Sequence, residues 1–119
     1  MKKKILIVDD DSLVLKTLQN LLLRQGYDVS CARSAEEAVR EAELGGFNLI
    51  VSDIRMPGQD GIELLKKIRA NGLETPFVFI TGYASENTPI DAIKLGARDY
   101  ILKPFNLDEL LESVKKYIA

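Results

Sequence analysis

The 119-residue sequence contains no histidine and a single cysteine, Cys31. Without histidine the chain cannot form a Ser–His–Asp triad, a histidine metal site or a phosphohistidine. One cysteine cannot form an internal disulfide, and nothing indicates an oxidising compartment. We expect Cys31 to be a small apolar residue of the core. Any covalent or metal chemistry must therefore use carboxylates, hydroxyls and lysines.

Long hydrophobic runs are also missing. After Met1 and three lysines, only the four apolar residues Ile5–Val8 precede three aspartates. A secretory signal needs an apolar run of about 7–15 residues, and a membrane-spanning helix needs about 20. We therefore expect a cytoplasmic protein that makes no membrane contact.

Neither sign of charge is in large excess. Sixteen lysines and arginines stand against eighteen aspartates and glutamates, a net charge of −2, which argues against direct nucleic-acid binding by this chain. Hydrophobic residues (46%) and charged residues (29%) are in ordinary globular proportion. The sequence ends inside its last predicted helical segment, so we expect one domain over residues 1–119 without an output domain.

Short apolar runs alternate with longer amphipathic segments along the whole chain. Each run is too short for a helix and is apolar at consecutive positions, which is typical of a strand buried on both faces. The five runs are Lys4–Val8, Tyr27–Ala32, Asn48–Ser52, Phe77–Ile80 and Asp99–Leu102. The alternation predicts an α/β fold of the (βα)5 type, with a doubly wound, parallel, five-stranded sheet.

The segments between the runs carry the signals of helix starts. Three pairs have capping-box spacing or a near variant of it: Ser34 with Glu37, Asp60 with Glu63, and Asn106 with Glu109. A fourth helix is predicted to begin at Thr88, before a proline, or at Ser85.

Polar residues follow four of the five predicted strands. Asp9, Asp10 and Asp11 come after the first strand, Asp53 after the third, Thr81 after the fourth and Lys103 after the fifth. Because parallel strands all end at one edge, where open α/β sheets bind ligands, these side chains should converge on one crevice. Asp11 is the exception, since a carboxylate at that position suits the start of the first helix.

A cluster of carboxylates at this edge favours a divalent cation. Neighbouring carboxylates repel one another and raise each other's pKa, and Mg²⁺ suits a few carboxylates, a backbone carbonyl, waters and a phosphate. The cation also keeps an adjacent aspartate ionised, so that the aspartate can attack phosphorus and form an acyl phosphate. Lys103 would add positive charge and Thr81 a hydroxyl donor, which suits phosphoryl transfer.

Four motifs, in this order, resemble the receiver domain of bacterial two-component response regulators. They are Asp9-Asp10, Asp53 in Asp-Ile-Arg-Met-Pro-Gly, Thr81-Gly82 and Lys103-Pro104-Phe105. The resemblance extends over the whole chain and implies a flavodoxin-like sheet of order 2-1-3-4-5, with a cis peptide before Pro104. Residues 80–84 and 96–105 are most similar to receivers of transcriptional activators of the nitrogen-regulation type.

The resemblance implies a role for each matching acid. Asp53 would accept the phosphoryl group. Asp10, Asp53 and the backbone carbonyl of Arg55 would bind Mg²⁺ directly, and Asp9 would contribute through water.

The resemblance also implies how the state of the acceptor is sensed. Thr81 would bond a phosphoryl oxygen, and Lys103 would pair with Asp53 before phosphorylation and with the phosphoryl group afterwards. Tyr100 would be the aromatic residue of the switch, moving inward together with Thr81.

The partner implied by the resemblance is a histidine kinase or a histidine phosphotransfer protein, which brings the histidine that this chain lacks. Phosphorylation would shift the domain between two packings. The family reads that shift on the face of the fourth helix, fifth strand and fifth helix, here about Ser85 to Ile118. Binding there would dimerise the protein, recruit a target or control an output domain.

Two other functions stay open at this point. A domain of the same fold could signal without phosphate, but the complete acidic set with Thr81 and Lys103 argues against it. A Mg²⁺-dependent phosphatase would share an aspartyl-phosphate intermediate, but it needs a second acid two residues after Asp53, where Arg55 stands. We therefore expect a phospho-acceptor switch and not a conventional enzyme.

Overall fold

The computed structural model of the protein describes residues 2–55, 60–82, 93 and 96–119. Its strands are β1 (Lys4–Val8), β2 (Asp28–Ala32), β3 (Leu49–Asp53), β4 (Phe77–Thr81) and β5 (Asp99–Leu102), and its helices are α1 (Ser12–Arg24), α2 (Ala35–Leu44), α3 (Gly61–Ala70) and α5 (Leu107–Tyr117). The helix predicted to begin at Ser85 or Thr88 lies outside the described residues, apart from Ile93.

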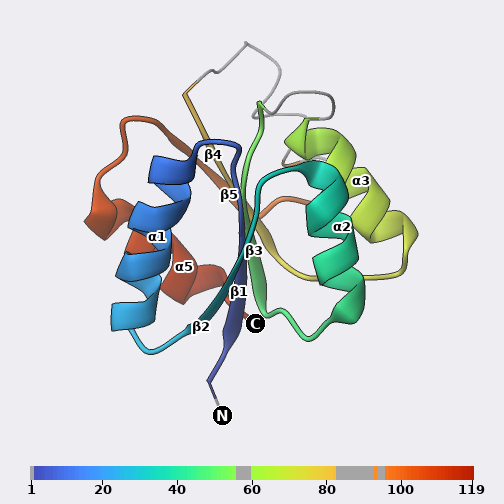
Figure 1. Ribbon diagram of the computed structural model, residues 1–119, viewed down its shortest axis with the longest axis horizontal. Coiled ribbons are helices and arrows are strands. Elements are labelled where there is room, and N and C mark those ends of the chain that lie inside the picture. Colours follow the sequence, from blue (N-terminus) through green and yellow to red (C-terminus); the bar gives the residue numbers. More distant parts are fainter. Residues whose placement is uncertain (1, 56–59, 83–92, 94–95) are drawn as a thin grey trace.

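The five strands form one parallel sheet in the order β2-β1-β3-β4-β5. Helices α1 and α5 cover one face of this sheet, and α2 and α3 cover the other (Figure 1). In the register, Val8 lies beside Ser52 and Thr81 lies beside Leu102, so the carboxyl ends of the strands share one edge. The doubly wound fold and the strand order are therefore confirmed.

The side chains of the central strands alternate between two apolar layers, because successive residues of a strand point to opposite faces. In β1, Leu6 and Val8 belong to the cluster with α2 and α3, whereas Ile5 and Ile7 belong to the cluster with α1 and α5. Every residue of β3 and β4 is buried. Burial of apolar surface contributes about 25 cal/mol per Å², so this double burial holds the ends of the central strands in place.

The prediction that every strand is buried on both faces is wrong for β2 and β5. Both lie at the edges of the sheet, and each has only one buried residue, Ala32 and Ile101 respectively. Helices on the two faces cover the rim of a sheet less completely than its centre. Cys31, which we expected in the core, is accordingly only half-buried on β2.

The helices begin at the predicted capping residues. Ser34 Oγ accepts from the backbone N–H of Glu37 at 3.1 Å, Asp60 Oδ1 accepts from Glu63 at 2.8 Å, and Asn106 Oδ1 accepts from Asp108, rather than Glu109, at 2.7 Å. Asp11 is the N-cap of α1, as predicted, and accepts from the N–H of Leu13 at 2.9 Å. These bonds satisfy N–H groups that have no partner inside the helix.

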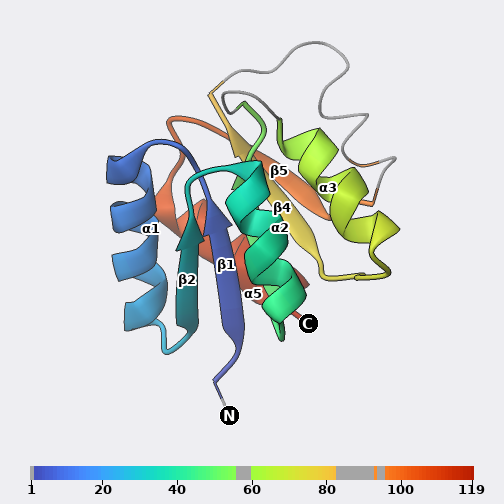
Figure 2. The same ribbon diagram turned by 45° about the vertical axis from the view of Figure 1, so that its right-hand side comes forward.

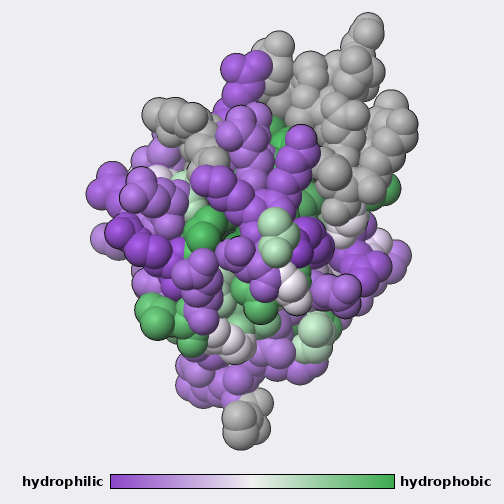
Figure 3. Space-filling model, turned by 90° about the vertical axis from the view of Figure 1, so that its right-hand side faces the viewer, coloured by the Kyte–Doolittle hydropathy of each residue, from purple (hydrophilic) through white to green (hydrophobic). Residues whose placement is uncertain are grey.

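The two chain ends lie at the end of the sheet opposite its carboxyl edge (Figure 2). The last backbone N–H, that of Ala119, donates to the carbonyl of Asn48 at 3.1 Å. Among the described residues, hydrophilic ones predominate on the side formed by α2 and α3 (Figure 3). In the described part of the chain, no helix combines the length and apolar character needed to cross a membrane.

Candidate functional site

Three carboxylates meet at the carboxyl edge of the sheet. Asp9 and Asp10 follow β1, Asp53 is the last residue of β3, and these two strands are neighbours. One carboxylate oxygen from each of the three residues lies within 4.8 Å of the others. Asp9 and Asp53 are buried and Asp10 is exposed, so the cluster is accessible from the Asp10 side.

Lys103 brings positive charge to this cluster from the far end of the chain. Its ammonium nitrogen lies 2.9 Å from Asp9 Oδ2 and 3.1 Å from Asp53 Oδ2, and it donates a hydrogen bond to each. The backbone N–H of Lys103 donates to the carbonyl of Thr81 at 2.7 Å. This bond ties the residue after β5 to the end of β4. The Lys103–Pro104 peptide is cis, as the resemblance implied.

The other oxygen of each buried carboxylate is held by backbone two residues further on. Asp9 Oδ1 accepts from the N–H of Asp11 at 2.9 Å, and Asp53 Oδ1 accepts from the N–H of Arg55 at 3.2 Å. Aspartate commonly forms such local turns. Across the described ranges, every buried side-chain nitrogen and oxygen has a hydrogen-bond partner. Both carboxylates are therefore oriented in the absence of any ligand.

Burial and the charge of the neighbouring Asp53 both disfavour the ionised form of Asp9 in this site. Burial raises the pKa of Asp9, and the charge of Asp53 adds to the rise, which outweighs the opposing N–H of Asp11 and ammonium of Lys103. Burial by itself lowers the pKa of Lys103, but hydrogen bonds to Asp9 and Asp53 and their charges outweigh it, so the pKa rises. Both groups hold their protons more tightly than they would in water.

This arrangement fits a hard metal ion. The ligand atoms on offer are carboxylate oxygens, which Mg²⁺ and Ca²⁺ prefer to nitrogen or sulfur. A divalent cation would also offset the like charges of the clustered carboxylates, since the charge of Asp53 contributes to the raised pKa of Asp9 together with burial. Asp9, Asp10 and Asp53 could therefore hold a metal ion together.

Of the remaining predicted site residues, the structure places Thr81 and Arg55 at this edge and Tyr100 within β5. Thr81 is fully buried at the end of β4. Arg55 follows β3 and donates its N–H to Asp53 Oδ1. Tyr100 lies on β5 and is 37% exposed, so its side chain is not part of the core.

One further residue lies beside this cluster and was not among the predicted site residues. Gly61, the first residue of α3, lies so close to the backbone of Asp53 and Ile54 that a methyl group at its Cα would overlap them. Its N–H donates to the carbonyl of Ile54 at 2.7 Å. The only sequence signal was a glycine directly after a capping aspartate, where helix propensity does not favour glycine.

A parallel sheet of order 2-1-3-4-5, with an acidic pocket and a lysine at its carboxyl edge, defines the class of flavodoxin-like phospho-acceptor domains. In this class the domain is the recipient of the phosphoryl group and acts as a signalling switch. It is not a conventional enzyme that turns over an external substrate.

Comparisons with known proteins agree with this class. The response regulator receiver domain family matches residues 5–115. A response regulator receiver domain protein (CheY-like) from Methanospirillum hungatei JF-1 is 38% identical, with a TM-score of 0.93 over 98% of this chain and 93% of that one. TrrA from Thermotoga maritima, solved in complex with Mg(2+)-BeF, is 34% identical, with a TM-score of 0.87 over 98% and 99% of the two chains.

The chain belongs to the response regulator receiver domain family. Such a domain implies a histidine kinase as its partner. The transcriptional regulatory protein CrdR of Helicobacter pylori is 38% identical over 118 residues, which make up 98% of this chain and 55% of CrdR. The chain thus spans about half the length of this curated relative.

Proposed function

We propose that Asp53 accepts a phosphoryl group from a histidine kinase or a histidine phosphotransfer protein in the cytoplasm. A carboxylate oxygen of Asp53 forms a bond to phosphorus while the bond between phosphorus and the donor's imidazole nitrogen breaks. The observation that carries this proposal is the position of the Lys103 ammonium, within 3.1 Å of both Asp9 and Asp53. That position lets Lys103 neutralise Asp53 first and a phosphoryl oxygen afterwards.

The metal of the proposed reaction is Mg²⁺, with Asp10, Asp53 and the carbonyl of Arg55 as direct ligands and Asp9 acting through water. When bound, Mg²⁺ neutralises charge on the transferred group and helps to keep Asp53 ionised. The oxygen-only donor set supports this choice, as does the structure of TrrA, which contains Mg²⁺ and a BeF group.

The protein itself aligns the Asp53 carboxylate for the reaction. Arg55 N–H and Lys103 hold the two oxygens of Asp53, so the carboxylate reaches an incoming phosphorus from a restricted direction. The Thr81 hydroxyl donates to a phosphoryl oxygen once Asp53 is modified. In the same proposal Tyr100 is the switch aromatic, and residues 1–119 act as one receiver domain.

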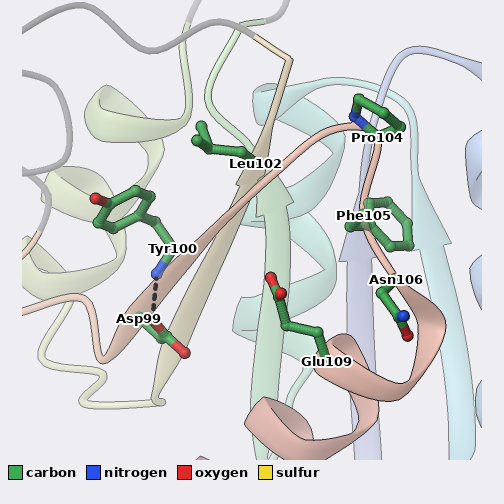
Figure 4. Close-up of a pocket in the computed structure, with 7 residues that line it drawn as sticks. All are labelled: Asp99, Tyr100, Leu102, Pro104, Phe105, Asn106 and Glu109. Atoms are coloured by element: carbon green, nitrogen blue, oxygen red, sulfur yellow. Dashed lines mark hydrogen bonds between the residues drawn. The ribbon is translucent and has the colours of Figure 1, made fainter.

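The surface beside β5 is the proposed output region, together with the predicted fourth helix. A groove of about 540 Å³ lies along β5 and the start of α5, lined by Asp99, Tyr100, Leu102, Pro104, Phe105, Asn106 and Glu109. Tyr100 and Leu102 extend on one side of β5, and Asn106 and Glu109 lie on the other (Figure 4). A target protein, an output domain or a second copy of the domain would bind here. The relationship to CrdR supports regulation of transcription as the outcome.

The test of the acceptor is the Asp53→Asn variant. With acetyl phosphate and Mg²⁺, we expect the wild-type protein to gain 80 Da by intact mass spectrometry, the mass of one phosphoryl group (PO₃H), and Asp53→Asn to gain nothing, because an amide cannot form the acyl phosphate. Undiminished uptake by Asp53→Asn would refute the assignment. Absence of uptake by the wild-type protein would instead favour a domain that signals without phosphate.

A further inference from the structure

The start of α3 packs against the backbone of the residue proposed as the acceptor. A Cβ at Gly61 would meet the carbonyl oxygen of Asp53, and would lie 2.9 Å from Cε1 of Phe79 and 3.0 Å from the Cα of Ile54. Two of these three neighbours are backbone atoms, and the third belongs to a fully buried ring. None of them can move aside without displacing the end of β3 or the core.

Space alone accounts for glycine at this position. Five other glycines have positive φ values between 81° and 105°, whereas Gly61 is not among them, so its backbone suits any L-residue. Alanine would also favour the helix more than glycine does. The absence of a side chain at residue 61 therefore serves the close approach between α3 and β3.

This approach bears directly on the acceptor. Gly61 N–H donates to the carbonyl of Ile54 at 2.7 Å, so the start of α3 holds the backbone that follows Asp53. The Asp53 carboxylate is held separately, by Lys103 at 3.1 Å and by Arg55 N–H at 3.2 Å. Moving the backbone of Asp53 by a few tenths of an ångström would therefore loosen both bonds and the metal ligand set with them.

We propose that Gly61 is a positioning residue of the receiver site: its missing side chain lets α3 fix the backbone of Asp53 and Ile54, and so aims the acceptor carboxylate into the pocket. The inference rests on the proposed function, because it concerns the same acceptor and the same Mg²⁺ ligands. Gly61 itself touches neither the phosphoryl group nor the metal.

The experiment compares three variants by calorimetric titration with MgCl₂ and by the rate of phosphorylation with acetyl phosphate. Gly61→Ala should raise the Mg²⁺ Kd at least tenfold and slow phosphorylation by at least as much. Gly82→Ala is the matched control near the same site, because its added Cβ would lie 3.7 Å from Cβ of Lys103, its nearest neighbour among the described residues. Ile68→Ala, at a fully buried position of α3, controls for lost stability.

The proposal predicts that both control variants bind Mg²⁺ within twofold of the wild-type protein, even though Ile68→Ala lowers the urea midpoint. A folded Gly61→Ala protein with wild-type Mg²⁺ affinity would overturn it. So would an Ile68→Ala protein that loses as much affinity, because the effect would then follow stability and not position.

A double variant at residues 61 and 79 covers the case in which Gly61→Ala alone fails to fold. Gly61→Ala with Phe79→Leu removes the ring contact but keeps the backbone contact, so weakened Mg²⁺ binding is again expected. Wild-type affinity in this double variant, or failure of both variants to fold, would overturn the proposal. If the wild-type protein itself neither binds Mg²⁺ nor takes up phosphate, the proposed function fails as well. A failure confined to Gly61→Ala leaves that function standing.

Discussion

Asp10 is the exposed member of an otherwise buried acidic cluster. It offers one carboxylate oxygen to the cluster. Its neighbour Asp11 carries the same charge but is engaged as the N-cap of α1. This pair of adjacent aspartates offers a clean comparison between a metal ligand and a helix cap.

We predict that Asp10→Asn weakens Mg²⁺ binding at least about tenfold, or about 1.4 kcal/mol, because one ligand charge is lost close to the cation. Asp11→Asn is the control: it removes the same charge, and asparagine caps a helix about as well as aspartate. Its Mg²⁺ affinity should stay within about threefold of the wild-type value. Calorimetric titration measures both constants. Equal affinities in the two variants would count against the proposed ligand set.

The positive charge of Lys103 compensates the negative charge of Asp9, which is completely buried. Asp9 is 0% exposed, and among the described residues Lys103 is the cation that forms an ion pair with it. Replacing the lysine leaves the Asp9 charge without that partner, which costs more than a surface pair would. The raised pKa of Asp9 also means that the ionised carboxylate opposes folding. The resulting loss of folding stability is absent at low pH, where Asp9 is protonated. It grows as the pH rises above the ordinary pKa of aspartate toward the raised pKa of Asp9.

We predict that Lys103→Met lowers the free energy of unfolding by about 1–3 kcal/mol at pH 7.5. At pH 4 the loss should be smaller, because more Asp9 is then protonated in the folded variant. Urea titrations of both proteins at the two pH values, without Mg²⁺, measure the difference. A loss that does not shrink on acidification would show that Lys103 stabilises through packing of its carbon chain. Lys103→Arg, which keeps the charge, should lose less at pH 7.5.

At the scale of elements, the helix starts hold the loops around the site. α2 begins with a variant of the capping box: Ser34 Oγ accepts from Glu37 N–H at 3.1 Å, and Glu37 Oε2 accepts from the N–H of Arg33, the residue before the cap, at 3.4 Å. The box lies directly after β2, whose last residue, Ala32, accepts from the N–H of Asp9 at 3.1 Å through its carbonyl. One cap therefore fixes the chain between the edge strand and the acidic cluster.

We predict that Ser34→Ala lowers the free energy of unfolding by about 1 kcal/mol, because the N–H of Glu37 loses its acceptor. Ser34→Asn should retain most of the stability, since asparagine caps equally well. Urea denaturation followed by circular dichroism measures both. Phosphorylation by acetyl phosphate should be unchanged in Ser34→Ala. A slower rate would indicate that the cap also positions the acidic cluster.

At the scale of the whole molecule, β5 connects the site with the proposed output region. Lys103 follows the strand and bonds the acidic cluster, while Tyr100 of the strand lines the proposed output groove and is 37% exposed. The backbone N–H of Tyr100 is bonded to Asp99 Oδ1 at 2.9 Å, and Ser113 of α5 donates to Asp99 Oδ2 at 2.9 Å. A shift of β5 would therefore be shared with α5.

We predict that Mg²⁺ with beryllium fluoride, as a stand-in for the phosphoryl group, reduces the solvent exposure of Tyr100. The readout is the ¹⁹F signal of fluorotyrosine-labelled protein and its broadening by a soluble paramagnetic agent. A Tyr100→Phe variant identifies the signal among those of the four tyrosines. The Asp53→Asn protein should show no change. Equal broadening before and after addition to the wild-type protein would contradict an inward movement of this ring.

The sequence by itself determined the alternation of strands and helices, the capping residues and the set of acids, hydroxyl and lysine at the strand ends. It could do so because side-chain periodicity and capping are local properties of the chain. The sheet order and the functional roles came from resemblance to a family, since alternation alone does not order strands. Thr81 and Lys103 are ordinary residues taken singly. They are site candidates because each follows a predicted strand at the carboxyl edge of the sheet.

Only the tertiary structure decided which charges meet and which strands are covered. The pairing of Lys103 with Asp9 joins residues 94 positions apart, and the half-burial of Cys31 follows from the place of β2 at an edge. The steric need for glycine at residue 61 arises where α3 crosses the end of β3. Long-range contacts of this kind depend on how the elements pack in three dimensions, and no spacing along the chain encodes them locally.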